Sequence, residues 1–208
     1  LDIVLVVEAL DSAFAARFWA FVEEGDYEIR ESSEGAKVLY RFQKPKAEGY
    51  PAMLELFSRA PEGLTLGGDA HLTPLPIDEA AASLSAILLN ESYYEFLKSM
   101  VREAGGIPVL DEAAITPFKA RAWLDLTRQR EEGLQVDEKN IRKHRNDVAR
   151  LLQLLSPEVR YLLPPSVAED MLAFVENAAI EADFDPRQFR VNMTREDVAA
   201  RLRAAYQL

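Results

Sequence analysis

The stretch LDIVLVV at residues 1–7 decides how the fold begins, because it is short, rich in β-branched residues and carries one acidic side chain, Asp2. A run of this kind is typical of a buried β-strand. The residues that follow, 12–25, are predicted to form an amphipathic helix that ends at Gly25. Its apolar side chains at Phe14, Phe18, Phe21 and Val22 fall on one helical face.

Three more predicted strands extend this layer. Residues 27–32 and 37–44 alternate apolar with polar side chains around the sequence SSEGA, which indicates a β-hairpin. Residues 53–59, with the sequence MLELFSR, predict a further strand. Residues 1–76 are therefore expected to form a small mixed β-sheet with one flanking helix.

The remaining residues, 77–208, are predicted to form an α-helical region, after an extended segment at residues 71–77. The expected helices are a buried one at 78–90, two charged amphipathic ones at 115–132 and 137–155 joined by a turn at Gly133, and two final ones at 166–182 and 194–208, the last capped by Thr194. The fold class that follows from this pattern is α+β.

The composition limits the chemistry that the chain can perform. Hydrophobic residues make up 49% and charged residues 28%, which is typical of a folded globular protein. The chain has no cysteine, so disulfides, thiolate zinc sites and a cysteine nucleophile are excluded. With only two histidines, a histidine-rich metal site is not expected. A bound metal would be held by carboxylates, which suits Mg²⁺ or Mn²⁺.

Charge and hydropathy indicate where the protein acts. The net charge of −11 argues against a surface covered in nucleic acid, although it allows a local basic patch. No apolar stretch is long enough to span a membrane, and the opening residues lack the basic flank of a signal peptide. We therefore expect a cytoplasmic protein with no membrane partner.

Asp2 and Glu55 are the first candidate site residues, because each is the only charge within an apolar run, LDIVLVV and MLELF respectively. A buried carboxylate is costly unless it is paired or binds a cation. If the two strands are neighbours, both acids come to one point on the sheet and can share a cation. The alternative is that each acid sits in water at a strand end or pairs with a nearby arginine.

Lys119 is a second candidate. With about 100° of rotation per residue, it falls inside an apolar stripe of the helix predicted at 115–132, and a lysine on that side needs an anion such as a nucleotide phosphate. The alternative is a side chain that reaches water past the packing surface. The residues of the stripe are Ile115, Phe118, Ala122, Trp123 and Leu126.

His144 and Asp147 are weaker candidates in the helix predicted at 137–155. His144 falls within its inward stripe, where a hydrogen-bonded core histidine is the common alternative to a catalytic one. Asp147 lies at the edge of the stripe and can equally form a helix pair with Arg150. The residues that mark the stripe are Ile141, Val148, Leu151, Leu152 and Leu155.

A group of basic and aromatic residues lies close together in the sequence between positions 40 and 50. Such a mixture can hold a nucleic-acid strand, but it also fits the polar side of a hairpin and its loop. Its members are Tyr40, Arg41, Phe42, Lys44, Lys46 and Tyr50.

Several of these segments together resemble the abortive-infection branch of the nucleotidyltransferase superfamily, whose palm is shared with DNA polymerase beta. The segments that carry the resemblance are LDIVLVVEALD at 1–11, YRFQKP at 40–45, MLELFSR at 53–59, PFKARAWLDL at 117–126 and KHRNDVARLLQLL at 143–155. In that family a Gly-Ser turn precedes a strand with two aspartates, and a later strand adds a third carboxylate. Together these acids hold two divalent cations that act on a nucleoside triphosphate (NTP).

The resemblance implies a role for each candidate. Asp2 matches the second aspartate and Glu55 the third carboxylate, so both are expected to be catalytic metal ligands. Lys119 matches the lysine that such toxins direct at the nucleotide, with His144 and Asp147 in a supporting nucleotide-binding motif. The first aspartate and the Gly-Ser turn would precede Leu1, so we expect this chain to keep the fold but to show little or no transfer.

The function implied is therefore metal-dependent transfer of a nucleotide from an NTP to an RNA or protein acceptor. The protein would be the toxin of a toxin–antitoxin or abortive-infection system, with an antitoxin protein as a further partner. One alternative is a non-catalytic module of the same fold that binds a partner protein or a nucleic acid. Another is that the helical half mainly serves dimerisation and that Lys119 is incidental.

Overall fold

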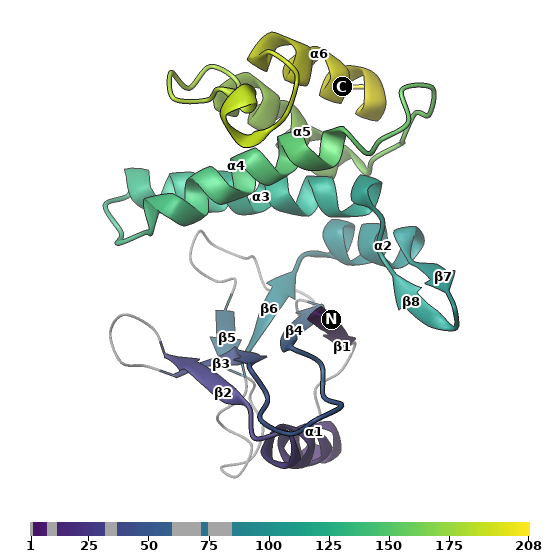
Figure 1. Cartoon of the computed structure of the whole chain (residues 1–208), viewed down its shortest axis with the longest axis vertical. Coiled ribbons are helices and arrows are strands. Elements are labelled where there is room, and N and C mark those ends of the chain that lie inside the picture. Colours follow the sequence, from purple (N-terminus) through teal and green to yellow (C-terminus); the bar gives the residue numbers. More distant parts are fainter. Residues whose placement is uncertain (1, 8–11, 32–36, 60–71, 75–84) are drawn as a thin grey trace. The chain divides into compact units, whose positions relative to one another are not determined.

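The computed structural model describes residues 2–7, 12–31, 37–59, 72–74 and 85–208, and it shows an α+β protein (Figure 1). The chain divides into two compact units, Leu1–Glu91 and Ser92–Leu208. The first unit holds a mixed β-sheet with one described helix, and the second is mainly helical. Each unit is described by itself below.

The sheet of the first unit is centred on strand β4, which pairs with three other strands. The strands are β1 (Asp2–Val7), β2 (Glu28–Glu31), β3 (Lys37–Gln43), β4 (Met53–Arg59), β5 (Leu72–Pro74) and β6 (Ser85–Leu89). Their order is β2-β3-β4-β6-β5, with β1 added to β4. β1 and β6 run parallel to β4, whereas β3 runs antiparallel to it. The predicted hairpin is confirmed, because β2 and β3 pair antiparallel.

Helix α1 (Ser12–Glu24) covers one face of this sheet, as its sequence predicts. Phe18 is buried against Phe42 of β3, with ring centroids 5.1 Å apart and planes at 71°. Leu54 and Leu56 of β4 belong to the same core. Phe21 lies at the edge of this apolar face and is 39% exposed. Its ring packs on that of Tyr50, a loop residue, at 4.9 Å and not on the sheet.

Strand β6 corrects the helix predicted at residues 78–90. Residues 85–89 (SAILL) form a strand that pairs parallel with β4, Phe57 with Ile87 and Arg59 with Leu89, while 78–84 lie outside the described residues. A short continuous apolar run fits a buried helix or a buried parallel strand equally well. Main-chain pairing with β4 decides between them, which no local pattern reveals. The predicted extended segment is confirmed where it is described, in β5.

The second unit begins with elements that the sequence pattern does not predict. These are helix α2 (Glu91–Met100), of which all but Glu91 belongs to this unit, and a two-stranded hairpin of β7 (Arg102–Ala104) and β8 (Ile107–Val109). The helices α3 (Glu112–Glu131), α4 (Glu138–Leu152), α5 (Pro165–Ala178), η1 (a 3₁₀-helix, Pro186–Phe189) and α6 (Arg195–Tyr206) then follow (Figure 1).

The four predicted helices of this unit are confirmed as α3, α4, α5 and α6, with ends that differ by a few residues. Gly133 adopts φ +84° in the turn between α3 and α4, a conformation that favours glycine. Thr194 caps α6 with both hydrogen bonds of a capping box, which it shares with Asp197. A core of apolar side chains from α3 to α6 holds the unit together, and its largest buried members include Trp123, Ile141, Leu152, Met171, Leu202 and Tyr206.

Candidate functional site

The face of the sheet opposite α1 carries Glu55, one of the first two predicted site residues. Along β4, Leu54 and Leu56 point toward α1, so Glu55 faces the other way, as the alternation of a strand requires. Glu55 pairs in register with Val4 of β1 on one side and with Arg41 of β3 on the other. Val4 is 44% exposed, so this face is open to solvent beside Glu55.

The backbone of Asp2 lies close to that of Glu55 on the neighbouring strand. It pairs in register with Met53, two residues before Glu55 on the adjacent parallel strand. The strands that carry the two predicted acids are thus direct neighbours, as the hypothesis of a shared cation requires. The side chain of Asp2 lies outside the described part of the chain.

Glu55 has a cationic partner in the structure. Arg41 donates from Nε to the Glu55 Oε1 atom at 2.5 Å, and its Nη2 also contacts this oxygen. The Glu55 side chain is only 13% exposed, so the carboxylate needs such a partner. This contact corresponds to the alternative in which the acid pairs with an arginine. Among the described residues, no group of three acidic or histidine side chains is arranged to hold a metal ion.

Lys119 and Asp147 come together between α3 and α4 in the second unit. The Lys119 Nζ lies 4.0 Å from Oδ2 of Asp147, and the Lys119 side chain is 31% exposed. Asp147 also accepts a hydrogen bond of 3.0 Å from Nη1 of Arg150, which confirms the expected helix pair. The lysine therefore has an anionic neighbour, and it keeps enough exposure to meet a ligand from solvent.

The predicted stripe around Lys119 is partly confirmed, because Trp123 is buried and its other members are half-buried. The face of α3 that is buried consists mainly of small side chains, and of the predicted stripe only Trp123 is buried. Small residues let α3 approach its neighbouring helices closely, so larger apolar side chains lie at the margins of the contact. Lys119 lies on the margin next to Trp123. The buried residues of α3 are Ala113, Ala114, Thr116, Pro117, Ala120 and Trp123.

His144 is half-buried on α4, three residues before Asp147. The inward face of α4 is close to the prediction, because Ile141, Val148 and Leu152 are all buried. The residue at the centre of this face is not His144 but Arg145, which the sequence analysis missed. Arg145 lies four residues after Ile141 and three before Val148, a spacing that places it on the same helical face as these apolar residues.

Arg145 is a buried cation with acidic partners. Its side chain is 3% exposed, and its Nη1 contacts Oε2 of Glu181 and lies 2.7 Å from Oδ1 of Asp183. The guanidinium also lies over the ring of Phe184 at 5.0 Å. The hydrogen bond from Arg145 holds the pKa of Asp183 below its usual value. These contacts tie the segment after α5 to α4, which is a structural role.

A second polar network joins α2, α3 and α5. Arg121 donates to Asp125 at 3.0 Å and to Asp170 at 2.8 Å, and the hydroxyl of Tyr93 donates to Asp170 at 2.9 Å. Burial and the adjacent Asp170 raise the pKa of Tyr93 far above its usual value. The tyrosine therefore stays protonated, and the network fixes the packing of the three helices.

The basic side chains near position 45 are balanced by acids. Lys44 pairs with Glu28 at 2.9 Å, and Lys46 pairs with Asp26 at 3.0 Å. Together with the pair of Arg41 and Glu55, these contacts match the polar side of a hairpin and its loop. This part of the chain therefore does not present the concentrated positive charge that a nucleic-acid backbone attracts.

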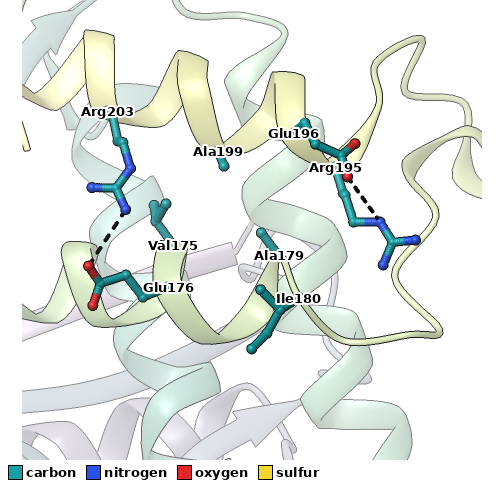
Figure 2. Close-up of a pocket in the computed structure, with 8 residues that line it drawn as sticks. All are labelled: Val175, Glu176, Ala179, Ile180, Arg195, Glu196, Ala199 and Arg203. Atoms are coloured by element: carbon teal, nitrogen blue, oxygen red, sulfur yellow. Dashed lines mark ion pairs between the residues drawn. The ribbon is translucent and has the colours of Figure 1, made fainter.

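A pocket of about 470 Å³ lies between α5 and α6 (Figure 2). Its lining comes from the end of α5, the two residues that follow this helix and one side of α6, and it includes none of the five predicted site residues. The pocket is therefore a surface feature separate from the predicted site.

Comparisons with protein families, with characterised proteins and with solved structures found no match to this chain. In the part of the chain that the structure describes, no helix combines the length and the apolar character needed to cross a membrane.

Proposed function

We propose that this chain belongs to a metal-dependent nucleotidyltransferase that moves a nucleotide from an NTP to an RNA or protein acceptor, as the toxin of a toxin–antitoxin or abortive-infection system. The observation that carries the proposal is the register of β1 and β4, in which Asp2 lies two residues from Glu55 on the neighbouring parallel strand. Two acids this close in register on neighbouring parallel strands suit a cation that binds triphosphate.

The residues fit a divalent cation in kind, because carboxylate oxygens are the ligands that Mg²⁺ and Mn²⁺ prefer. Such a cation would be held by Asp2 and Glu55, and it would supply the positive charge that orients the triphosphate. Binding at Glu55 requires the carboxylate to leave Arg41. In the second unit, Lys119 is a separate candidate for binding a nucleotide phosphate, and its ammonium group lies beside Asp147.

The experiment is a thermal-shift titration with each NTP in the presence and absence of Mg²⁺ or Mn²⁺. A ligand that binds only the folded state stabilises it by about 2.7 kcal/mol at a concentration of roughly 100 times Kd. We expect a metal-dependent shift that Glu55→Gln and Lys119→Ala abolish. The exposed Lys143 provides the matched control, and Lys143→Ala should keep the shift.

Arg41→Gln separates a metal ligand from a structural ion pair. Both Arg41→Gln and Glu55→Gln break the same contact, but only the second removes a carboxylate. The proposal predicts that Arg41→Gln keeps metal-dependent binding, whereas Glu55→Gln loses it. If the two variants behave alike, or if no NTP shifts the parent chain with either metal, the assignment is wrong.

A second candidate function is a non-catalytic module of the same kind of fold, which binds a partner protein or a nucleic acid. The observation in its favour is the ion pair of Glu55 with Arg41, since the carboxylate already has the cation it needs. This candidate predicts that neither Mg²⁺ nor Mn²⁺ changes the stability of the chain, and that Arg41→Gln and Glu55→Gln destabilise it equally.

A further inference from the structure

The solvent side of α4 carries a row of positive charge. Ile141 and Val148 of this helix are buried in the core of the second unit. Lys139, Arg142 and Lys143, by contrast, are all exposed. Side chains three or four residues apart on a helix are neighbours, with about 5–6 Å between their Cβ atoms. These three cations, which we call the basic row, therefore form one continuous charged surface.

The acids that border the basic row are already held by other cations. Each of them pairs with an arginine outside the row. The pairs are Glu138 with Arg130 at 3.5 Å, Asp147 with Arg150 at 3.0 Å and Asp183 with Arg145 at 2.7 Å. Within the described residues, no ion pair or side-chain hydrogen bond engages the three cations of the row. The row therefore keeps its positive charge for a ligand from solvent.

The make-up of this surface selects its ligand. A protein interface is built around apolar and aromatic anchors, and a helix that binds a membrane inserts such side chains into it. The large apolar side chains between residues 139 and 150 are Ile141 and Val148, and both are buried. A phosphate backbone needs only cations and hydrogen-bond donors. The row therefore fits a nucleic acid better than an acidic protein or an anionic membrane.

The net charge of −11 does not prevent this contact, because most of it comes from the other unit. The second unit holds 17 basic and 19 acidic residues, whereas the first unit holds 7 and 16. At physiological ionic strength, salt screens exposed charges that are more than about 8 Å apart. A phosphate bound at the row is therefore governed mainly by the charges of the row itself.

We propose that the basic row binds the phosphate backbone of a single nucleic-acid strand without reading its bases. With about 100° of rotation per residue, Asp147 and Arg145 fall on opposite flanks of the row, and Arg145 holds Asp183 on its side. The row is thus one line of cations with an acid on each side. A duplex held against the helix would bring a second backbone onto one of these acids. The row includes none of the proposed nucleotide-site residues, so this binding does not depend on nucleotide transfer.

Fluorescence anisotropy with a labelled uridine strand of about 16 nucleotides tests the row. The chain is titrated into the strand at several salt concentrations between about 50 and 200 mM. We expect the logarithm of the binding constant to fall with that of the salt concentration with a slope of about −2, because a single strand releases roughly 0.7 counterions for each phosphate that a cation contacts. Lys143→Gln should reduce the slope by about 0.7, and the triple variant Lys139→Gln, Arg142→Gln, Lys143→Gln should raise Kd at least about tenfold.

The matched control is Lys98→Gln, which removes the same charge from an exposed lysine of α2. It should keep both the affinity and the slope, and a DNA duplex or a polyglutamate peptide of matched length should bind more weakly than the strand. Glu55→Gln should lose the NTP-dependent shift and keep strand binding, so a failure of either proposal can be recognised by itself. The proposal is overturned if the strand does not bind at the lowest salt, if Lys98→Gln and Lys143→Gln weaken it equally, or if the duplex or the peptide binds as tightly.

Discussion

Tyr206 at the end of α6 completes a hydrogen bond that α3 cannot make for itself. Pro117 lies inside α3 and has no N–H to donate to the carbonyl of Ala113, four residues earlier. The Tyr206 hydroxyl donates to this carbonyl at 3.0 Å in a buried position. The neighbouring Thr116 cannot replace it, because its hydroxyl already donates to the carbonyl of Glu112 at 2.7 Å.

Tyr206→Phe therefore leaves a buried carbonyl without a donor. Such a loss costs about 1–3 kcal/mol, more than the net value of an ordinary hydrogen bond. Pro117→Ala returns the missing N–H to the helix, so Tyr206→Phe should cost less than about 1 kcal/mol in that background. The two substitutions should then show a coupling free energy of about 1–2 kcal/mol, which residues that share a partner often show.

Urea unfolding of the parent, the two single variants and the double variant measures this coupling, provided the slope of free energy against urea stays constant. The control is Tyr161→Phe, which also removes a tyrosine hydroxyl. The ring of Tyr161 packs beside that of Tyr206, with centroids 5.7 Å apart. We expect the control to change stability by less than about 0.5 kcal/mol. If Tyr206→Phe costs the same free energy of unfolding in the parent chain and in the Pro117→Ala background, the reasoning is refuted.

Two further predictions concern local packing and pH. Gly25→Ala should destabilise the first unit by about 1–3 kcal/mol. A Cβ at this position would lie 2.4 Å from Cε2 of Tyr27 and 2.8 Å from Cδ1 of Tyr50. A variant with the same melting temperature as the parent chain would contradict this clash. The hydrogen bond from Arg145 lowers the pKa of Asp183 below its ordinary value of 3.8. The ionised Asp183 therefore stabilises the fold fully above pH 3.8, and this contribution is lost as the pH falls through the lower pKa of the folded state. Asp183→Asn should therefore lose less stability on acidification than the parent chain, and identical acid-unfolding curves would show that this pair contributes nothing.

The sequence predicts best those elements whose pattern is set within the element. The alternation of MLELFSR places Glu55 on the opposite face from Leu54 and Leu56, as the structure has it. Thr194 forms its capping box because the required acid, Asp197, lies three residues further on. In both cases, local geometry alone determines the outcome.

The predictions fail where a distant partner decides. Residues 85–89 become a strand because β4 offers them a parallel neighbour. The buried face of α3 consists mainly of small residues such as Ala120, which allow close helix packing. A prediction based on the spacing of large apolar residues does not identify such a face. Arg145 is not predicted to be buried, because a buried cation is expected only where acidic partners can be identified. Its partners, Glu181 and Asp183, lie more than thirty residues later in the sequence.

The same reasoning explains why Glu55 carries both candidate functions. A carboxylate that is 13% exposed on a strand must have a cation beside it, whatever its role. Arg41 supplies that cation from the adjacent strand, so the acid remains stable in the absence of any ligand. A metal ion would compete for the same oxygen from the open side of the sheet, where Val4 leaves access. The ion pair is therefore compatible with a resting metal ligand, and only the difference between Arg41→Gln and Glu55→Gln distinguishes that state from a permanent structural contact.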